Sequence, residues 1–205
     1  VHMLGVPVDM NSIMTIANKH NLKVFEDNCE AVGAEYEGKY LGTIGDAGAF
    51  SYDFGKVITC GEGGMVVFKD KDLYDKAMAW HDHGHENNPD LPRWEDSRSG
   101  SGFNYRMNEM QGAIGKAQLK KLDFVISEQR KNAQLIEKSI SGLPIKMRVI
   151  PHKGYETSDA LVFFVESDQI ALECRHALID AGFGTNPFAD SSEDNGRREA
   201  NELRE

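Results

Sequence analysis

Apolar side chains recur at helical spacing in several stretches of the chain. Behind Asp9, a residue suited to cap a helix, Met10, Ile13, Met14 and Ala17 are three or four positions apart, which predicts a helix over 10–20. Similar patterns predict further helices along the chain. In the helix over 108–121 we expect Ile114, Ala117 and Leu119 to point inward. The further helices are predicted over 71–80, 108–121, 122–141 and 168–181.

Short apolar runs bounded by turn residues predict β-strands. They predict a small hairpin over 36–42, with Gly38 at its turn. The strand over 22–25 is expected to deliver Glu26 and Asp27 at its end. The remaining strands are predicted over 47–52, 65–68, 145–150 and 161–166.

Strands that alternate with helices predict an α/β fold, and the pattern changes toward α+β near residues 125–140. We therefore expect one domain over 1–125 and part of a second over 126–186. Residues 187–205 are almost devoid of apolar side chains, which predicts a disordered or non-native tail. The long polar stretch 86–102 is typical of a functional loop.

Composition narrows the possible partners. The net charge is −10 and no basic stripe is present, which argues against nucleic acid and anionic membrane surfaces. No segment approaches the roughly 20 apolar residues of a membrane span. Three scattered cysteines indicate a reduced, cytoplasmic protein. Histidines alternate over 81–85, but no second cluster completes a metal site.

Lys56 is the first candidate for chemistry. It follows the apolar run Ala-Phe-Ser-Tyr and precedes a Gly-Glu-Gly-Gly cluster. A lysine amine is strongly hydrated, and one placed at a glycine-rich bend between apolar segments is suited to react with a carbonyl group. The alternative is an ordinary exposed lysine beside a turn.

Asp27, Asn104 and Arg106 are further candidates. An acid at the carboxyl end of a strand lies where α/β sheets bind ligands, although Asp27 can equally serve as a loop or capping residue. Asn104 and Arg106 precede a predicted helix, where both can donate to a phosphate. Capping and surface charge are the alternatives for this pair.

The order of these windows carries a resemblance. Glu-Asp-Asn-Cys-Glu-Ala is followed by Gly-Thr-Ile-Gly-Asp-Ala-Gly-Ala-Phe-Ser-Tyr, the lysine with Gly-Glu-Gly-Gly, His-Gly, and Gly-Phe-Asn-Tyr-Arg-Met. This series resembles the sugar aminotransferases of the DegT/DnrJ/EryC1/StrS family, of the aspartate-aminotransferase fold type I. Asp-Phe-Gly-Lys-Val-Ile-Thr-Cys with Asp-His-Gly-His is most similar to the branch that aminates 8-amino-3,8-dideoxy-octulosonate.

The resemblance implies a pyridoxal 5′-phosphate (PLP) enzyme. Lys56 falls on the family's Schiff-base lysine, and Asp27 on the acid that pairs with the pyridine nitrogen. Ser51 falls on a serine that reaches the phosphate, and Asn104 on an asparagine that reaches the phosphate of a neighbouring subunit. Arg106 lies nearby as a further cofactor contact.

The fold implied is the mixed-sheet large PLP-binding domain, of which 1–125 would be the C-terminal part, followed by the start of a small domain. The reaction implied is transfer of an amino group, with glutamate as the expected donor, to a keto or aldehydo sugar. Cell-surface polysaccharide, including lipopolysaccharide, or nucleotide-sugar synthesis is the expected setting. A cytoplasmic homodimer with a shared active site is the expected assembly.

One position departs from the family pattern. Glutamine is usual at the position of Glu30, where its amide donates to the cofactor's phenolic oxygen; a carboxylate there would repel that oxygen unless protonated or displaced. His83 falls on the family's His-Gly position and His85 is a candidate for contact with a sugar acid. Both histidines can also be surface residues of a helix end.

Two other functions stay open. A sugar dehydratase of the same superfamily is disfavoured because such relatives carry histidine at the lysine position. A non-catalytic homologue is disfavoured by the complete set Lys56, Asp27, Ser51 and Asn104. The family's N-terminal phosphate loop and ring-stacking aromatic are not in this sequence, so we expect a fragment that binds the cofactor poorly by itself.

Overall fold

The computed structural model describes residues 1–151 and 154–185. The first helical elements are η1 (Met3–Gly5) and α1 (Met10–Lys19), followed by α2 (Lys71–His81), α3 (Glu109–Leu119), α4 (Leu122–Ile140) and α5 (Asp168–Asp180). The strands are β1 (Phe25–Asp27), β2 (Glu35–Tyr36), β3 (Lys39–Tyr40), β4 (Ala47–Ser51), β5 (Gly64–Phe68), β6 (Lys146–Met147), β7 (Gly154–Tyr155) and β8 (Phe163–Phe164). The predicted tail, 187–205, lies outside the described residues.

The chain separates into two compact units. Of the described residues, the first unit comprises Val1–Lys138 and Ile150–Leu161, and the second comprises Ser139–Val149 and those from Val162 onward. Segment 150–161 joins the first unit because β7 pairs with β2, a pairing over a long sequence separation that local pattern does not reveal. The assignment of 1–125 to a large domain and 126–186 to a small one stays a prediction.

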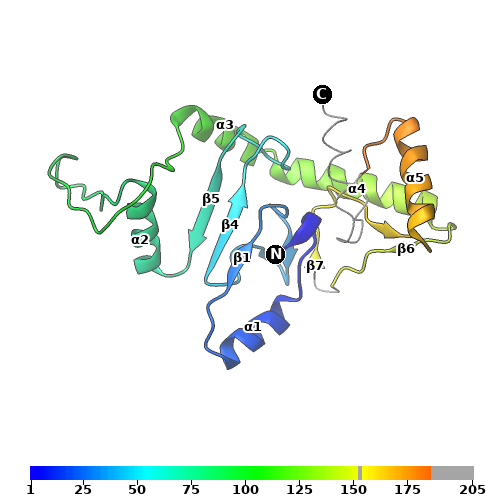
Figure 1. The fold of residues 1–205 in the computed structure, drawn as a ribbon, viewed down its shortest axis with the longest axis horizontal. Coiled ribbons are helices and arrows are strands. Elements are labelled where there is room, and N and C mark those ends of the chain that lie inside the picture. Colours follow the sequence, from blue (N-terminus) through cyan, green and yellow to red (C-terminus); the bar gives the residue numbers. More distant parts are fainter. Residues whose placement is uncertain (152–153, 186–205) are drawn as a thin grey trace. The chain divides into compact units, whose positions relative to one another are not determined.

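A mixed sheet forms the centre of the first unit. Its strand order is β1-β4-β5, with β1 parallel to β4 and β4 antiparallel to β5 (Figure 1). This is the mixed α/β architecture that was expected. Gly48 lies where β4 passes the backbone of Gly42: a Cβ at residue 48 would be 2.1 Å from the carbonyl oxygen of residue 42. Only glycine permits that approach.

The first strand is displaced from its predicted position. The expected strand 22–25 ends where β1 begins, at Phe25, and Glu26 and Asp27 lie inside the strand, in register with Gly48 and Ala49. The N–H of Val24 instead donates to the side chain of Asp46, at 2.8 Å. Pairing with β4 therefore determines where the strand starts, and this could not be inferred from the apolar run alone.

Glu26 is a structural acid. Its side chain is buried, and its carboxylate accepts hydrogen bonds from His2 Nε2 and from the N–H groups of Gly42, Ile44 and Gly45. Burial alone would raise the pKa of Glu26, but these hydrogen bonds outweigh it and the pKa is lowered. The carboxylate thus joins the N-terminal segment and the loop before β4 to the sheet.

The helices agree closely with prediction because local signals define their ends. Asp9, Asn108 and Ser167 cap α1, α3 and α5, and Asn108 forms a capping box with Gln111. The inward orientation expected in α3 is wrong. Ile114 and Leu119 are 45% and 51% exposed, Ala117 is exposed as well, and no residue of α3 is buried in this chain.

The strands of the second unit are shorter than predicted. Runs 145–150 and 161–166 contribute only β6 and β8, which form a two-stranded antiparallel sheet. With no third strand beside them in the described residues, hydrogen bonding does not extend the strands further. The hairpin over 36–42 is confirmed by β2 and β3, whose turn places Glu37 and Gly38 at positive φ.

Candidate active site at the sheet edge

The candidate residues of the first unit gather where β1 and β4 end. The two strands run parallel, so their carboxyl ends lie at the same edge of the sheet. Asp27 is the last residue of β1 and pairs with Ala49, two residues before Ser51, the last residue of β4. The chain then enters the loop that carries Lys56. This edge is where α/β sheets bind ligands.

A small set of backbone hydrogen bonds shapes the Lys56 loop. Tyr52 N–H donates to the carbonyl of Gly63, and the Tyr52 carbonyl accepts from Cys60 N–H, so the loop closes on the end of β4. Lys56 N–H donates to the carbonyl of Asp53. Buried Val32, Tyr52, Ile58 and Cys60 form an apolar cluster that anchors this loop.

Lys56 and Glu30 form an ion pair. Nζ of Lys56 lies 3.7 Å from Oε1 of Glu30, and the two side chains are 23% and 35% exposed. The second oxygen of Glu30 accepts from Leu4 N–H at 3.1 Å. The carboxylate at the family's glutamine position therefore lies against the lysine amine. This pairing was not foreseen from the sequence, because the two residues are 26 positions apart.

Asp27 is held by Cys29, a residue that sequence reasoning missed. Cys29 N–H donates to Oδ1 of Asp27 at 3.1 Å. Hydrogen bonds from the Cys29 backbone and then from its thiol lower the pKa of Asp27, so the carboxylate is ionised at neutral pH. Burial, followed by the hydrogen bond to Asp27, raises the pKa of the Cys29 thiol to about 11. The sequence alone did not reveal this contact, because a cysteine two positions after an acid at the end of a strand is not a specific pattern.

The hydroxyl of Ser51 donates no hydrogen bond to any residue that the structure describes. Its Oγ accepts from Asp53 N–H at 3.3 Å. A hydroxyl that accepts one hydrogen bond still has its own O–H available for a ligand. The edge thus presents an amine, an ionised carboxylate and a hydroxyl.

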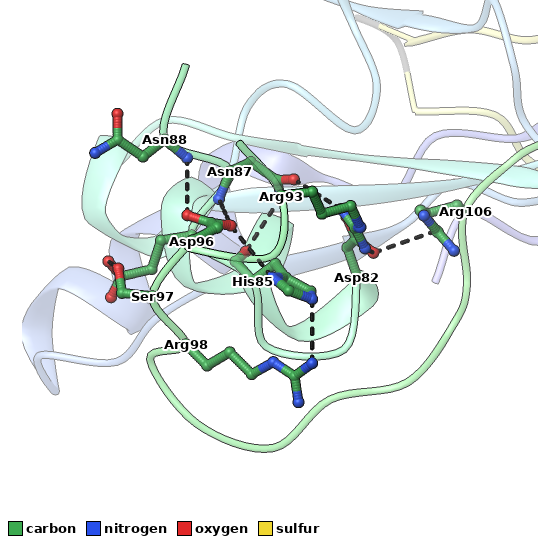
Figure 2. A network of polar contacts seen from close by, with 10 residues as sticks. Asp82, His85, Asn87, Asn88, Arg93, Asp96, Ser97, Arg98 and Arg106 are labelled. Carbon is green, nitrogen blue, oxygen red and sulfur yellow. Dashed lines mark hydrogen bonds and ion pairs between the residues drawn. The ribbon is translucent and has the colours of Figure 1, made fainter. Parts of the chain in front are cut away.

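Asn104 and Arg106 belong to another polar cluster, centred on Asp82. Figure 2 shows Asp82 with its two arginines, Arg93 and Arg106. Arg93 donates to both carboxylate oxygens of Asp82, at 2.9 and 2.6 Å, and Arg106 Nε lies 3.3 Å from Oδ1. Arg106 Nε also donates to Oδ1 of Asn104 at 2.9 Å. The hydrogen bond from Arg93 lowers the pKa of Asp82 to about 2. Burial acts in the opposite direction, and the positive charge of Arg106 lowers the pKa further.

The two candidate histidines differ. His83 is exposed and has a positive φ of 57°. His85 is buried; its Nδ1 lies 3.3 Å from Asp96, and Arg98 lies 3.3 Å from its Nε2 (Figure 2). Within this chain the ring of His85 is therefore engaged by the 86–102 loop. Contact of either histidine with substrate stays a prediction.

The structure thus joins Lys56 to Glu30 and Arg106 to Asn104, and it places Asp27 and Ser51 on one sheet edge. No contact is seen between the Lys56 group and the Asn104 group within the described residues. The described ranges contain no group of three potential metal ligands, and none of their helices has the length and apolar character needed to cross a membrane.

Comparison with known proteins identifies the family of this chain. The model of the DegT/DnrJ/EryC1/StrS aminotransferase family matches residues 1–187. GDP-perosamine synthase of Escherichia coli O157:H7 is 45% identical over 143 residues, which are 70% of this chain and 38% of that protein. GDP-4-keto-6-deoxy-D-mannose 3-dehydratase of Yersinia pseudotuberculosis is 34% identical over 201 residues, 92% of this chain and 51% of that protein.

Solved structures give the same fold. The aminotransferase from Psychrobacter cryohalolentis is 34% identical, with a TM-score of 0.73 over 82% of this chain and 46% of that one. The E. coli GDP-4-keto-6-deoxy-D-mannose-3-dehydratase with bound hydrated PLP is 29% identical, with a TM-score of 0.80 over 99% of this chain and 55% of that one.

The fold is therefore that of the fold type I PLP-dependent aminotransferases, confirming the α/β prediction with its mixed sheet. The chain belongs to the DegT/DnrJ/EryC1/StrS aminotransferase family, as the order of its motifs indicated. It spans between 38% and 51% of the length of the two relatives named above.

Proposed function

We propose that the full-length protein is a PLP-dependent aminotransferase that transfers an amino group from an amino acid, glutamate first among the candidates, to a keto or aldehydo sugar. The observation that carries this proposal is the placement of the Lys56 amine in a loop that leaves the sheet edge where Asp27 and Ser51 end their strands. The family match over 1–187 and the relatives that make GDP-perosamine support it.

The side chains at this edge fit the cofactor. Lys56 would hold it covalently, and the ionised carboxylate of Asp27 would accept a hydrogen bond from the protonated ring nitrogen. Ser51 would donate its hydroxyl hydrogen to the phosphate. When bound, the cofactor supplies a ring that withdraws electrons from the substrate carbon and carries the amino group between the two substrates.

Each residue then has a distinct task. The carboxylate of Asp27 would keep the ring nitrogen protonated, which would make the ring a stronger electron acceptor. Nζ of Lys56 would move a proton to or from the substrate carbon. Asn104 would donate to the phosphate of a second copy in a homodimer, with Arg106 beside it. Glu30 would hold the amine of Lys56.

The substrate is proposed at two levels. A keto or aldehydo sugar is the class supported by the family and by relatives whose names specify GDP- and UDP-linked sugars. Within that class we propose 3,8-dideoxy-8-oxo-octulosonate, on the resemblance of the Lys56 loop and the His83–His85 region. Incubating the protein with this sugar acid or with a nucleotide-linked keto sugar, each with glutamate, would separate the two by the aminated product.

Covalent labelling tests the role of Lys56. The full-length protein is incubated with PLP, reduced with borohydride, digested and mapped by mass spectrometry. We expect the cofactor on the peptide that contains Lys56 and no such label in Lys56→Ala. Substantial label on another lysine, with none at Lys56, would contradict the proposal. Loss of the cofactor's visible absorbance band on adding glutamate would test the donor, and a band unchanged by any amino acid would favour a non-catalytic homologue.

A sugar dehydratase is the second candidate, favoured by the Yersinia relative, which matches 92% of this chain. Lys56 counts against it, because the family resemblance associates dehydration with histidine at that position. Product analysis discriminates directly. Transamination yields an amino sugar and a 2-oxo acid from the donor, whereas dehydration yields a sugar that has lost an oxygen and retains no new nitrogen.

A further inference from the structure

The amide of Asn104 has a defined orientation. Arg106 Nε–H donates to Oδ1 of Asn104 at 2.9 Å. A guanidinium group has donors and no acceptor, so the atom that faces it must be the amide oxygen. The NH₂ group of Asn104 is then left to a ligand, since it has no partner in the part of the chain that the structure describes. The exposed side chain therefore offers two donors on its unpaired side.

Arg106 also contacts the buried acid Asp82 through the same nitrogen. Its Nε lies 3.3 Å from Oδ1 of Asp82, whose side chain is only 5% exposed. The backbones of Asp82 and Asn104 form an antiparallel bridge, and His83 N–H donates to the carbonyl of Phe103. Asp82, Asn104 and Arg106 thus belong to two segments whose backbones are paired. The carboxylate of Asp82 is the most buried of the three side chains.

We infer that Asp82 is a positioning residue that acts through Arg106 to aim the NH₂ group of Asn104 at an anionic oxygen of a ligand. The inference rests on the proposed function, in which that oxygen belongs to the cofactor's phosphate. Without the negative charge at residue 82, the guanidinium group loses the attraction that holds it beside Oδ1, and the amide is free to turn.

Arg93 provides a matched control. It also neutralises Asp82, donating to both carboxylate oxygens, and it arises from the 86–102 loop. Unlike Arg106, it makes no hydrogen bond to Asn104. A variant at residue 93 therefore perturbs the same carboxylate and the same loop without cutting the link from Asp82 to the amide.

The test compares two ligands that differ only in the phosphate. Dissociation constants for PLP and for pyridoxal are measured on the full-length protein, and their ratio reports what the phosphate contributes. We expect Asp82→Asn to reduce the preference for PLP by about tenfold, with little change for pyridoxal, because a hydrogen bond to a charged group is worth about that factor. Arg93→Ala should leave the ratio unchanged.

Two further variants exclude a purely structural effect. Arg106→Met removes the link while leaving Asp82 paired with Arg93, and we expect the same loss of preference. In an Asn104→Ala background, Asp82→Asn should cause no further loss. An unchanged ratio in Asp82→Asn and Arg106→Met, or an equal loss in Arg93→Ala, would overturn the inference.

Failure of this inference is distinguishable from failure of the proposed function. Borohydride labelling of Lys56 in the wild type and in Asp82→Asn establishes the role of the lysine whatever the ratio of affinities. Absence of labelling in the wild type defeats the proposed function instead. Affinity for the two ligands is read by quenching of protein fluorescence, so the result does not depend on catalytic turnover.

Discussion

Two charged clusters in the first unit are built in opposite ways. Lys56 and Glu30 form a single pair at 3.7 Å, with both side chains accessible to water. Asp82 is buried and binds two arginines, one of them through two hydrogen bonds at 2.9 and 2.6 Å (Figure 2). A loosely held amine remains available for chemistry, whereas a buried, multiply bonded carboxylate holds a loop and its neighbours in place.

The largest effect on stability is expected from removing Asp82. Asp82→Ala should lower the free energy of unfolding by about 2 kcal/mol, because hydrogen bonds from charged donors are lost at a buried position. Urea denaturation of the full-length protein measures it. A loss of unfolding free energy smaller than about 0.5 kcal/mol is what an exposed ion pair would give. Such a result would show that Asp82 stabilises the fold no more than an exposed pair such as Lys56 and Glu30.

The carboxylate of Asp82 should also make the stability of the protein depend on pH. The pKa of Asp82 is lowered to about 2 in the folded protein, mainly by Arg93, against about 3.9 in an unfolded chain. Its contribution is therefore complete above about pH 4 and is lost as pH falls toward 2. The difference in melting temperature between the wild type and Asp82→Asn should narrow over that interval. A difference that stays constant down to pH 2 would contradict the assignment.

The sheet edge should show a smaller, chemical effect at Cys29. With a pKa of about 11 the thiol is protonated at pH 8, and alkylation by iodoacetamide should be slow. Asp27→Asn removes two of the causes that raise the pKa of Cys29, the hydrogen bond to Asp27 and its negative charge, so alkylation of Cys29 should become about threefold faster. Burial, the larger cause, remains. Cys60 serves as the control, because it is buried and its thiol bonds to the carbonyl of Glu62 and not to Asp27. An equal increase in the alkylation rate of Cys60 would indicate that Asp27→Asn destabilises the fold in general.

The smallest effect is expected from Glu30→Gln. Because the pair with Lys56 is partly exposed, removing the charge should change the free energy of unfolding by less than about 0.5 kcal/mol. Urea denaturation at low and at high salt measures it, and the two values should agree within that margin. Destabilisation as large as that of Asp82→Ala would show that Glu30 has a structural role comparable to Asp82.

Local signals made the helices predictable. Caps such as Asp9 and Asn108 act within one turn of the chain, so α1 and α3 begin within a residue or so of where the pattern placed them. The strands were less predictable because their limits depend on partners. β1 starts at Phe25 only because β4 pairs with it there, and β7 exists only because β2 accepts it.

The candidate site divides in the same way. Lys56, Asp27 and Asn104 were predicted from their residue types and positions, and Ser51 was predicted from the family resemblance. Which residues assist them depended on contacts between distant segments. Cys29 beside Asp27, Glu30 beside Lys56 and Asp82 behind Arg106 all became visible only with the fold.

The neighbouring acids of β1 show the division most directly. The sequence by itself indicated the family, a candidate lysine and the presence of an acid at the end of the strand. Only the tertiary structure decided that Glu26 is a buried structural acid and Asp27 an acid of the candidate site. Successive side chains of a strand point to opposite faces, so their surroundings depend on what packs on each face, which the local sequence does not specify.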